Sequence, residues 1–245
     1  LVRMAVARAR RLEPLDEIEL SVNPEVLIVG GGVAGMVCAL SVAEQGHRVH
    51  IVEREAELGG MARRLHKTID GLDVQKYLAD LKERVLRHPL IAVYTSAKIT
   101  ETTGYIGNFK TLIDTPRGRV EIHHGAVVIA TGATEYRPKE FLYGQHEGVM
   151  TQLELEERLA ARDEKVTGAG TIVMIQCVGS RNQEHNYCSR ICCTHAIKNA
   201  LTIKEQNPEA DVYILFRDMR TYGFYEDHYR EASDRGVIFV RFEDE

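Results

Sequence analysis

The sequence predicts an α/β fold with two parallel sheets and a β-meander crossing over the first. An apolar run at 25–29 leads through a glycine-rich turn into a helical pattern at 33–45. A second alternation of strand and helix patterns begins near residue 171, and short alternating segments separated by turn residues lie between the two. Strands that alternate with helices are typical of parallel sheets. We therefore predict two Rossmann-type units.

The first turn reads G-x-G-x-x-G, at Gly30, Gly32 and Gly35. Such glycines allow a tight turn, close approach of a pyrophosphate and close helix packing, and the amides at the helix start face the phosphates. The following strand, 48–52, delivers Glu53, an acid that accepts hydrogen bonds from ribose hydroxyls and repels a 2′-phosphate. These features predict a dinucleotide site; the alternative is a glycine-rich turn that only packs.

Two further stretches favour FAD over NAD. Glu53 is followed by Arg54 and then by Leu-Gly-Gly-Met at 58–61, and a later apolar strand at 126–129 ends in Ala-Thr-Gly at 130–132. A parallel strand that ends in small residues lets its backbone pass close to a cofactor. Both stretches resemble signatures of the two-dinucleotide-binding flavoproteins, although a core strand with a tight turn is the plain alternative. The predicted cofactor contacts are Gly30, Gly32, Ala34, Gly35, Glu53, Arg54, Gly60, Met61, Ala130, Thr131 and Gly132.

The remaining elements follow from their periodicity. A helix is expected at 72–87, and short strands at 91–94, 98–102, 109–114 and 120–123 form the predicted meander. The second unit is predicted as buried strand 171–176, helix 189–205, strand 211–216, helix 226–234 and strand 237–242. We predict a linker helix over 1–22 that joins the core to an upstream region, a FAD-binding domain over 23–168, and a truncated second half-domain over 169–245.

Four cysteines stand where the second unit would carry its glycine turn, at Cys177, Cys188, Cys192 and Cys193. Ordinary nicotinamide binding by this unit is therefore not expected. Thiolates suit iron–sulfur or zinc sites, and four of them are the usual ligands of a [4Fe-4S] cluster. We expect Cys192 and Cys193 at a helix start, where backbone amides offset cluster charge. A zinc knuckle and buried apolar thiols are the alternatives.

The chain resembles the A subunit of heterodisulfide reductase over essentially its whole length. The matching stretches are 151–156, 177–181, 187–193 and 220–223. The resemblance implies a thioredoxin-reductase-like fold, bound FAD, and a [4Fe-4S] cluster on the four cysteines. It also implies that Lys198 lies beside the reactive flavin nitrogen. The alternative is that Lys198 is an ordinary exposed lysine of a helix. Implied partners are B and C subunits and a hydrogenase or dehydrogenase module, with flavin-based electron bifurcation as a further expectation.

Composition agrees with a cytoplasmic α/β protein. The net charge of −5 and the lack of a long basic run argue against a nucleic-acid partner, and no apolar stretch is long enough for a membrane span. The five cysteines, including Cys38 in the first helix, fit a reducing compartment. The start at Leu1 and the end at Glu245 lead us to expect a fragment, with a homodimer as an option.

Two functions other than cluster-mediated electron transfer remain open. In the first, a flavin-dependent dithiol reductase, Cys192 pairs with Cys188 or Cys193 in a redox-active disulfide without a metal, and Arg190 or the helix start lowers a thiol pKa. In the second, the chain is a docking scaffold without catalysis. Iron and sulfide content distinguishes the first alternative, and flavin reducibility distinguishes the second.

Overall fold

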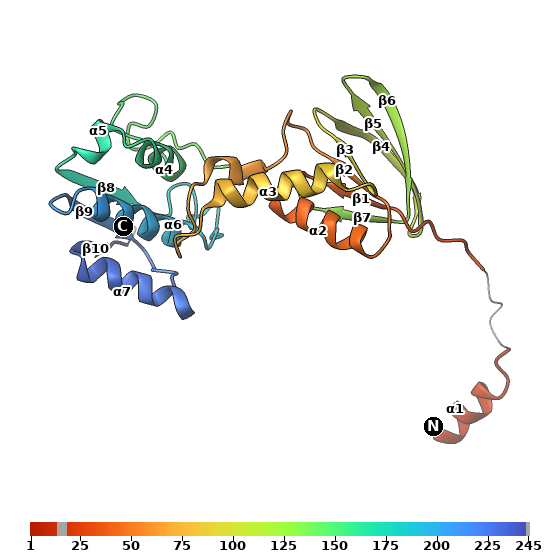
Figure 1. Cartoon of the computed structure of the whole chain (residues 1–245). Coiled ribbons are helices and arrows are strands. Elements are labelled where there is room, and N and C mark those ends of the chain that lie inside the picture. Colours follow the sequence, from red (N-terminus) through yellow and green to blue (C-terminus); the bar gives the residue numbers. More distant parts are fainter. Residues whose placement is uncertain (14–18, 244–245) are drawn as a thin grey trace.

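The computed structural model describes residues 1–13 and 19–243, which form two lobes and an outlying helix (Figure 1). The helix, α1 (Val2–Ala9), buries none of its residues and lies apart from both lobes. Within the predicted linker helix over 1–22, the described residues are helical at Val2–Ala9, and residues 14–18 fall outside the described residues. No helix in the described ranges is both long and apolar enough to cross a membrane.

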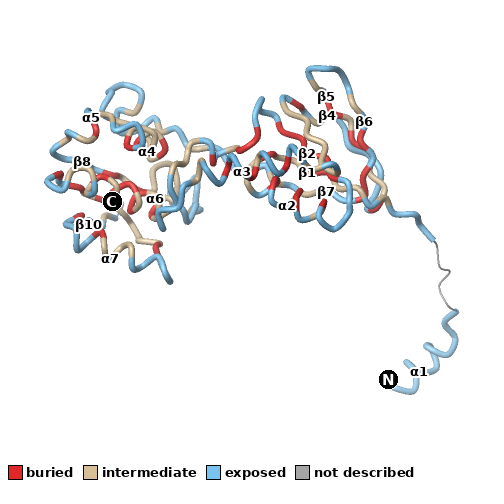
Figure 2. Tube along the Cα trace, in the orientation of Figure 1, coloured by how far each residue is buried: buried red, intermediate tan, exposed pale blue. Residues whose placement is uncertain are grey.

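The first lobe is built on a parallel sheet in the order β3-β2-β1-β7. Its strands are β1 (Val26–Val29), β2 (Val49–Val52), β3 (Ile91–Tyr94) and β7 (Ala126–Ile129). The helices α2 (Val33–Glu44) and α3 (Val74–Arg87) pack together against it, and their apolar faces share one core with the sheet. Figure 2 shows this buried layer in red between the sheet and the two helices. The glycine turn therefore joins the central strand β1 directly to α2.

The meander contains three strands, β4 (Lys98–Tyr105), β5 (Asn108–Thr115) and β6 (Gly118–His124), paired antiparallel in that order. The assignment of 91–94 to the meander was wrong, because β3 pairs parallel with β2 from Val49 opposite Ile91 to Val52 opposite Tyr94. Ile-Ala-Val-Tyr is a short apolar run that can pair in either kind of sheet, and its register with β2 makes it an outer strand of the first sheet.

The second lobe has a parallel sheet in the order β10-β9-β8, as the alternation predicted. Its elements are α4 (Gln152–Ala160), α5 (Glu164–Thr167), β8 (Thr171–Ile175), α6 (Cys192–Gln206), β9 (Asp211–Phe216), the 3₁₀ turn η2 (Gly223–Tyr225), α7 (Glu226–Asp234) and β10 (Val237–Arg241). Leu155, Leu159 and Val166 of α4 and α5 lie in the same core as α6 and β9. In packing, α4 and α5 thus belong with the second sheet, whereas the predicted division at 168/169 stays a prediction.

Two predicted buried strands are instead partly exposed. In β7 the side chain of Ile129 is 69% exposed, and in β8 that of Val173 is 53% exposed. Each strand lies at an edge of its sheet in the described part of the chain, with a neighbour on one side. Both edges therefore present apolar side chains to solvent.

The helix α6 begins at Cys192, three residues later than the predicted start at 189. Arg190 has φ +62, a left-handed backbone angle that a right-handed helix does not accept. Cys192 and Cys193 consequently form the first turn of α6, as expected.

Candidate functional site

The turn between β1 and α2 is closely packed at two glycines and open at a third. Gly30 has φ +111, and a Cβ there would lie 2.3 Å from the carbonyl oxygen of Ala130. A Cβ on Gly35 would lie 2.0 Å from the carbonyl oxygen of Gly30. At Gly32, the N-cap of α2, a Cβ would meet nothing within 4 Å, and no side chain caps the helix. The open side of the turn is thus a cradle that fits a pyrophosphate.

Glu53, at the end of β2, is only 7% exposed. Its carboxylate accepts hydrogen bonds from the backbone N–H of Gly31 at 2.7 Å and of Glu55 at 2.8 Å. The carboxylate therefore holds the glycine turn in place through the backbone of Gly31. Each oxygen retains capacity for a further hydrogen bond, so this position is compatible with the predicted contact to ribose.

The other predicted cofactor residues lie around the same turn. The 3₁₀ turn η1 (Gly60–Arg64) follows a bridge between Gly32 and Gly59, and a Cβ on Gly60 would lie 3.3 Å from the Cα of Gly32. Ala34, Met61, Thr131 and Gly132 are exposed and available to a ligand. The side chain of Arg54 is also exposed, at 72%, but it already forms an ion pair with Glu55 at 3.3 Å.

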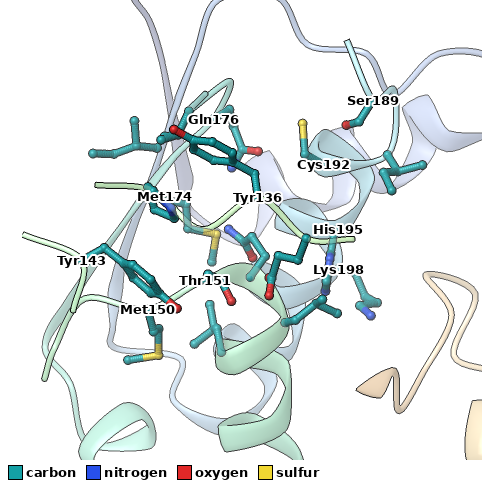
Figure 3. A pocket seen from close by; sticks show the side chains of 18 of the residues that line it. Tyr136, Tyr143, Met150, Thr151, Met174, Gln176, Ser189, Cys192, His195 and Lys198 are labelled. Atoms are coloured by element: carbon teal, nitrogen blue, oxygen red, sulfur yellow. The ribbon is translucent and has the colours of Figure 1, made fainter. Parts of the chain in front are cut away.

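A cleft of about 1770 Å³ runs between the lobes. Met61 and Ala133 line it beside the predicted flavin-contacting loops, and Cys177, Cys192 and Lys198 line it from the second lobe. Pockets that bind drug-sized ligands have volumes of roughly 300–1,000 Å³, so this cleft is large enough for a dinucleotide cofactor. Figure 3 shows Cys192, His195 and Lys198 along α6 at this cleft.

The cysteine loop, residues 176–191, connects β8 to α6 and carries unusual backbone conformations. Cys177, Arg181 and Arg190 have φ values of 63, 59 and 62, a left-handed region that non-glycine residues rarely adopt. Such conformations persist where the surroundings over-determine them, and they cluster at functional sites. Gly179 lies under the ring of Tyr136, because a Cβ there would be 2.2 Å from that ring.

The four cysteines are not gathered into one ligand set. Cys192 and Cys193 hydrogen-bond through their thiols, the backbone N–H of Cys177 donates to Cys192, and Cys188 accepts from the N–H of Arg190 at 3.4 Å. Among the described residues, no three His, Cys, Asp or Glu side chains lie close enough to hold a metal ion. The four thiols are of the type that binds a cluster, but binding requires the cysteine loop to bring them closer together.

The vicinal thiols of Cys192 and Cys193 differ in acidity. A hydrogen bond from the thiol of Cys193 lowers the pKa of Cys192 to about 6. Burial opposes this shift, while hydrogen bonds from Ser189 and the backbone add to it. The same thiol contact, together with burial, raises the pKa of Cys193. The two thiols titrate as a pair, in which Cys192 carries the thiolate.

Lys198 lies in a buried ionic network, which contradicts the alternative of an exposed helical lysine. Its side chain is 12% exposed, and its ammonium donates to Glu156 at 2.6 Å and to the carbonyl of Lys67 at 3.0 Å. Glu156 also contacts His195 Nε2 at 2.7 Å and accepts from the N–H of His66 at 2.6 Å. Burial opposes ionisation of Glu156, but the bonds with His195 and Lys198 hold its pKa at about 2, while burial lowers the pKa of Lys198.

Sequence reasoning missed the carboxylates that join the lobes. Besides Glu156, Arg64 of η1 contacts Glu157 at 2.7 Å and Glu135 at 3.1 Å. These partners are separated by 71 to 93 residues in sequence. The one available signal was the Thr-x-x-Glu pattern at Thr151, a capping box that starts α4 and thereby indicates which face its acids share.

A family model described as pyridine nucleotide-disulphide oxidoreductase matches residues 24–180. Among curated proteins, the A subunit of the H(2):CoB-CoM heterodisulfide,ferredoxin reductase of Methanothermobacter marburgensis is 31% identical over 334 aligned positions, covering 98% of this chain and 51% of the relative. The iron-sulfur A subunit of the CoB--CoM heterodisulfide reductase of Methanocaldococcus jannaschii is 29% identical with the same coverage. The chain spans about half the length of these relatives, and the alignment exceeds its 245 residues, so the relatives contain inserted segments.

Solved structures agree on the fold. Thioredoxin reductase of Lactococcus lactis matches with a TM-score of 0.55 at 16% identity, over 90% of this chain and 67% of that chain. Thioredoxin reductase of T. acidophilum matches with a TM-score of 0.53 at 16% identity, over 89% of this chain and 64% of that chain. These comparisons confirm the predicted thioredoxin-reductase-like fold and the predicted similarity to the A subunits of heterodisulfide reductases. Because the family model covers well over half of its residues, the chain belongs to the pyridine nucleotide-disulphide oxidoreductase family.

Proposed function

We propose that this chain is the flavin-binding, electron-transferring part of a heterodisulfide-reductase-like complex. The observation that carries the proposal is the shared cleft, which Met61 and Ala133 line from the flavin-contacting loops and Cys177 and Cys192 line from the cysteine loop. A two-electron cofactor and a one-electron carrier would thus lie next to each other. The names of the relatives, which are A subunits of reductases, agree with this assignment.

FAD would supply electron transfer in pairs or singly, and the residues around the glycine turn would hold it. The open side of Gly32 and the N-terminal amides of α2 would accept the pyrophosphate. Glu53 would keep the turn in shape while accepting from ribose hydroxyls. Gly60 to Met61 and Ala130 to Gly132 would contact the part of FAD that enters the cleft, while exposed Arg54 lies outside its walls.

A [4Fe-4S] cluster on Cys177, Cys188, Cys192 and Cys193 is the second part of the proposal. Its chemistry would be one-electron relay. Cys192 and Cys193 stand at the N-terminus of α6, whose free amides favour negative charge. The backbone N–H of Cys177 donates to the thiol of Cys192, and Cys188 would reach the same site through the irregular chain of the cysteine loop.

Lys198 would hold a positive charge beside the reactive flavin nitrogen. Its ammonium is fixed by Glu156, which is itself held by His195 and the amide of His66. The network leaves Lys198 on the wall of the cleft, next to the cysteine-bearing turn of α6. A fixed cation stabilises the more negative, reduced form of a neighbouring cofactor.

Partner subunits follow from the same proposal. The relatives are A subunits of reductases, so B- and C-like subunits and a hydrogenase or dehydrogenase module are the proposed electron partners. Electron bifurcation and the division into domains at residues 22/23 and 168/169 are parts of this proposal. The cytoplasmic location and the homodimer remain predictions.

The test is anaerobic purification followed by flavin, iron, sulfide and zinc analysis of the wild-type chain and of two serine variants. We expect bound FAD and about four irons and four sulfides per chain, with the metal lost in Cys192→Ser. The matched control, Cys38→Ser, alters a cysteine that packs on the first core, and metal content should not change. Zinc, or no metal, would contradict the cluster, and a flavin that no electron donor reduces would favour the scaffold alternative.

A second candidate, metal-free dithiol–disulfide exchange, is favoured by the contact between the thiols of Cys192 and Cys193. Oxidation of two thiols to a disulfide would pass two electrons to the flavin and release two protons. The low pKa of Cys192 would supply the attacking thiolate near neutral pH. This candidate predicts two thiols that titrate reversibly with flavin reduction in protein free of iron.

A further inference from the structure

Several buried hydrogen-bonding atoms around the cysteine loop have no partner. They are Nε2 of Gln176, Nη1 of Arg181, Nε of Arg220 and Oγ1 of Thr221. Gln176 and Thr221 are 3% and 5% exposed, so solvent does not satisfy them. Buried polar groups in native proteins almost always have a partner, and each exception requires an explanation. Three of these atoms can only donate, so the missing partner is rich in acceptors.

These donors gather at one edge of the second sheet. Gln176 and Arg181 follow the carboxyl end of β8, and Arg220 and Thr221 follow the carboxyl end of β9. β8 and β9 are parallel neighbours, so their carboxyl ends meet at the same edge. Ligands of open α/β sheets bind outside this edge.

Two residues of this group contact the cysteine thiols. The guanidinium of Arg181 hydrogen-bonds to the thiol of Cys177 and is held on its other side by Asp218 at 2.6 Å. The backbone N–H of Arg220 donates to the sulfur of Cys193, which lies 3.8 Å from the carbonyl oxygen of Asp218. The guanidinium of Arg181 and the backbone of Arg220 therefore contact two of the four thiols, and the buried side chain of Arg220 adds an unpaired donor at the same edge.

We propose that Arg181 and Arg220, with Gln176 and Thr221, form a buried donor set that holds an anionic iron–sulfur group on these cysteines and raises its reduction potential. This inference rests on the proposed cluster. Hydrogen bonds to sulfur and nearby cations favour the more negative, reduced state, which gains one electron from the reductant. A cluster bound to these thiolates would supply the acceptor atoms that the donor set lacks, because the thiols and the donors lie at the same edge of the second sheet.

A nucleotide phosphate is the competing occupant, because it is also an acceptor-rich anion. The turn argues against it. Cys177 stands after β8 in place of a cradle glycine, with φ +63, so the turn lacks the bare backbone that lets a phosphate approach closely. The guanidinium of Arg181 contacts that thiol as well as Asp218, so a sulfur acceptor is already within its reach.

The test measures a potential rather than activity. The full chain is reconstituted anaerobically with ferrous iron and sulfide, and the cluster is titrated with a reductant under spectroscopic observation. Arg181→Gln and Arg220→Gln should each reduce the equilibrium constant for cluster reduction about tenfold, a shift of about 59 mV to lower potential. Arg181→Lys keeps the charge and should restore most of the shift. Arg230→Gln is the matched control, because Arg230 is an exposed arginine of α7 paired with Glu226.

The outcomes separate this inference from the proposed function. A wild-type chain that binds no iron contradicts the proposed cluster itself, and the donor set falls with it. A wild-type cluster whose potential is the same in both arginine variants and in the control overturns the donor set alone. Weaker NADPH binding with an unchanged potential overturns it in favour of a phosphate site. If circular dichroism shows that Arg181→Gln does not fold, Arg220→Gln decides, since its backbone bond to Cys193 remains.

Discussion

Glu156→Gln should strongly destabilise the second lobe. The wild-type carboxylate is 5% exposed and accepts hydrogen bonds from Lys198, His195 and the chain of the first lobe. Glutamine keeps the size and an acceptor but removes the charge, so the buried ammonium of Lys198 loses its counterion. Removing one partner of a buried ion pair costs about 3–5 kcal/mol.

The pKa of Glu156 gives a similar magnitude. A carboxyl whose pKa falls from 4.5 in the unfolded chain to about 2 in the folded chain stabilises the fold by about 3 kcal/mol at neutral pH. Because the folded pKa is the lower one, this stability is complete above pH 4.5 and is lost as the pH falls towards 2. The wild-type unfolding free energy should therefore decrease over that interval, and Glu156→Gln should remove this part of the decrease.

Thermal unfolding followed by circular dichroism measures both effects. A loss of about 3 kcal/mol lowers the midpoint by roughly 6–12 °C in a chain of this size. Glu83→Gln is the control, because Glu83 pairs with Arg87 on the exposed face of α3 and should matter by less than about 0.5 kcal/mol. Adding Lys198→Met to Glu156→Gln should recover part of the loss, since neither charge is then left buried alone. Equal midpoints for Glu156→Gln and Glu83→Gln would refute the reasoning.

Three further predictions concern the glycine turn and the cysteine loop. Gly32→Ala should fold normally but lose FAD in an absorbance assay, because its methyl enters open space, whereas Gly35→Ala should also lower stability by about 1–3 kcal/mol through its clash at 2.0 Å. Iodoacetamide should alkylate Cys192 in metal-free protein with a rate that rises through a midpoint near pH 6. Cys177→Gly should stabilise metal-free protein by about 1 kcal/mol in urea unfolding, because φ +63 suits glycine, while abolishing iron binding.

Local patterns were sufficient for most elements of the fold. The glycine turn, the alternation after residue 171 and the turn residues of the meander each depend on neighbours in sequence, and the strands and helices there lie within a few residues of their predicted bounds. The assignment of β3 failed because a short apolar run pairs equally well in either kind of sheet, and only the register with β2 decides. Exposure of Ile129 likewise depends on which strands flank β7.

The candidate site was predictable as a set of residue types but not as a geometry. Four cysteines after a strand indicate a metal or redox site without revealing that, among the described residues, no three of them are gathered closely enough to hold a metal ion. The ionic network around Glu156 joins residues up to 90 positions apart in sequence, so no local pattern contains it. Lys198 was assigned through family resemblance, and its burial became apparent only when α4, α6 and residues 66–67 were placed together.

The two lobes use one backbone device for different chemistry. Gly30 directly follows β1 with φ +111, and Cys177 follows β8 with φ +63, so each turn bends through a left-handed residue before its helix. Glycine takes this angle freely and leaves space for a phosphate, whereas cysteine takes it at a cost and fills that space with a thiol. Strained residues of this kind cluster at functional sites, which agrees with the proposed role of the Cys177 thiol. Under that proposal, the cysteine loop takes the place that a nucleotide cradle would have in the second unit.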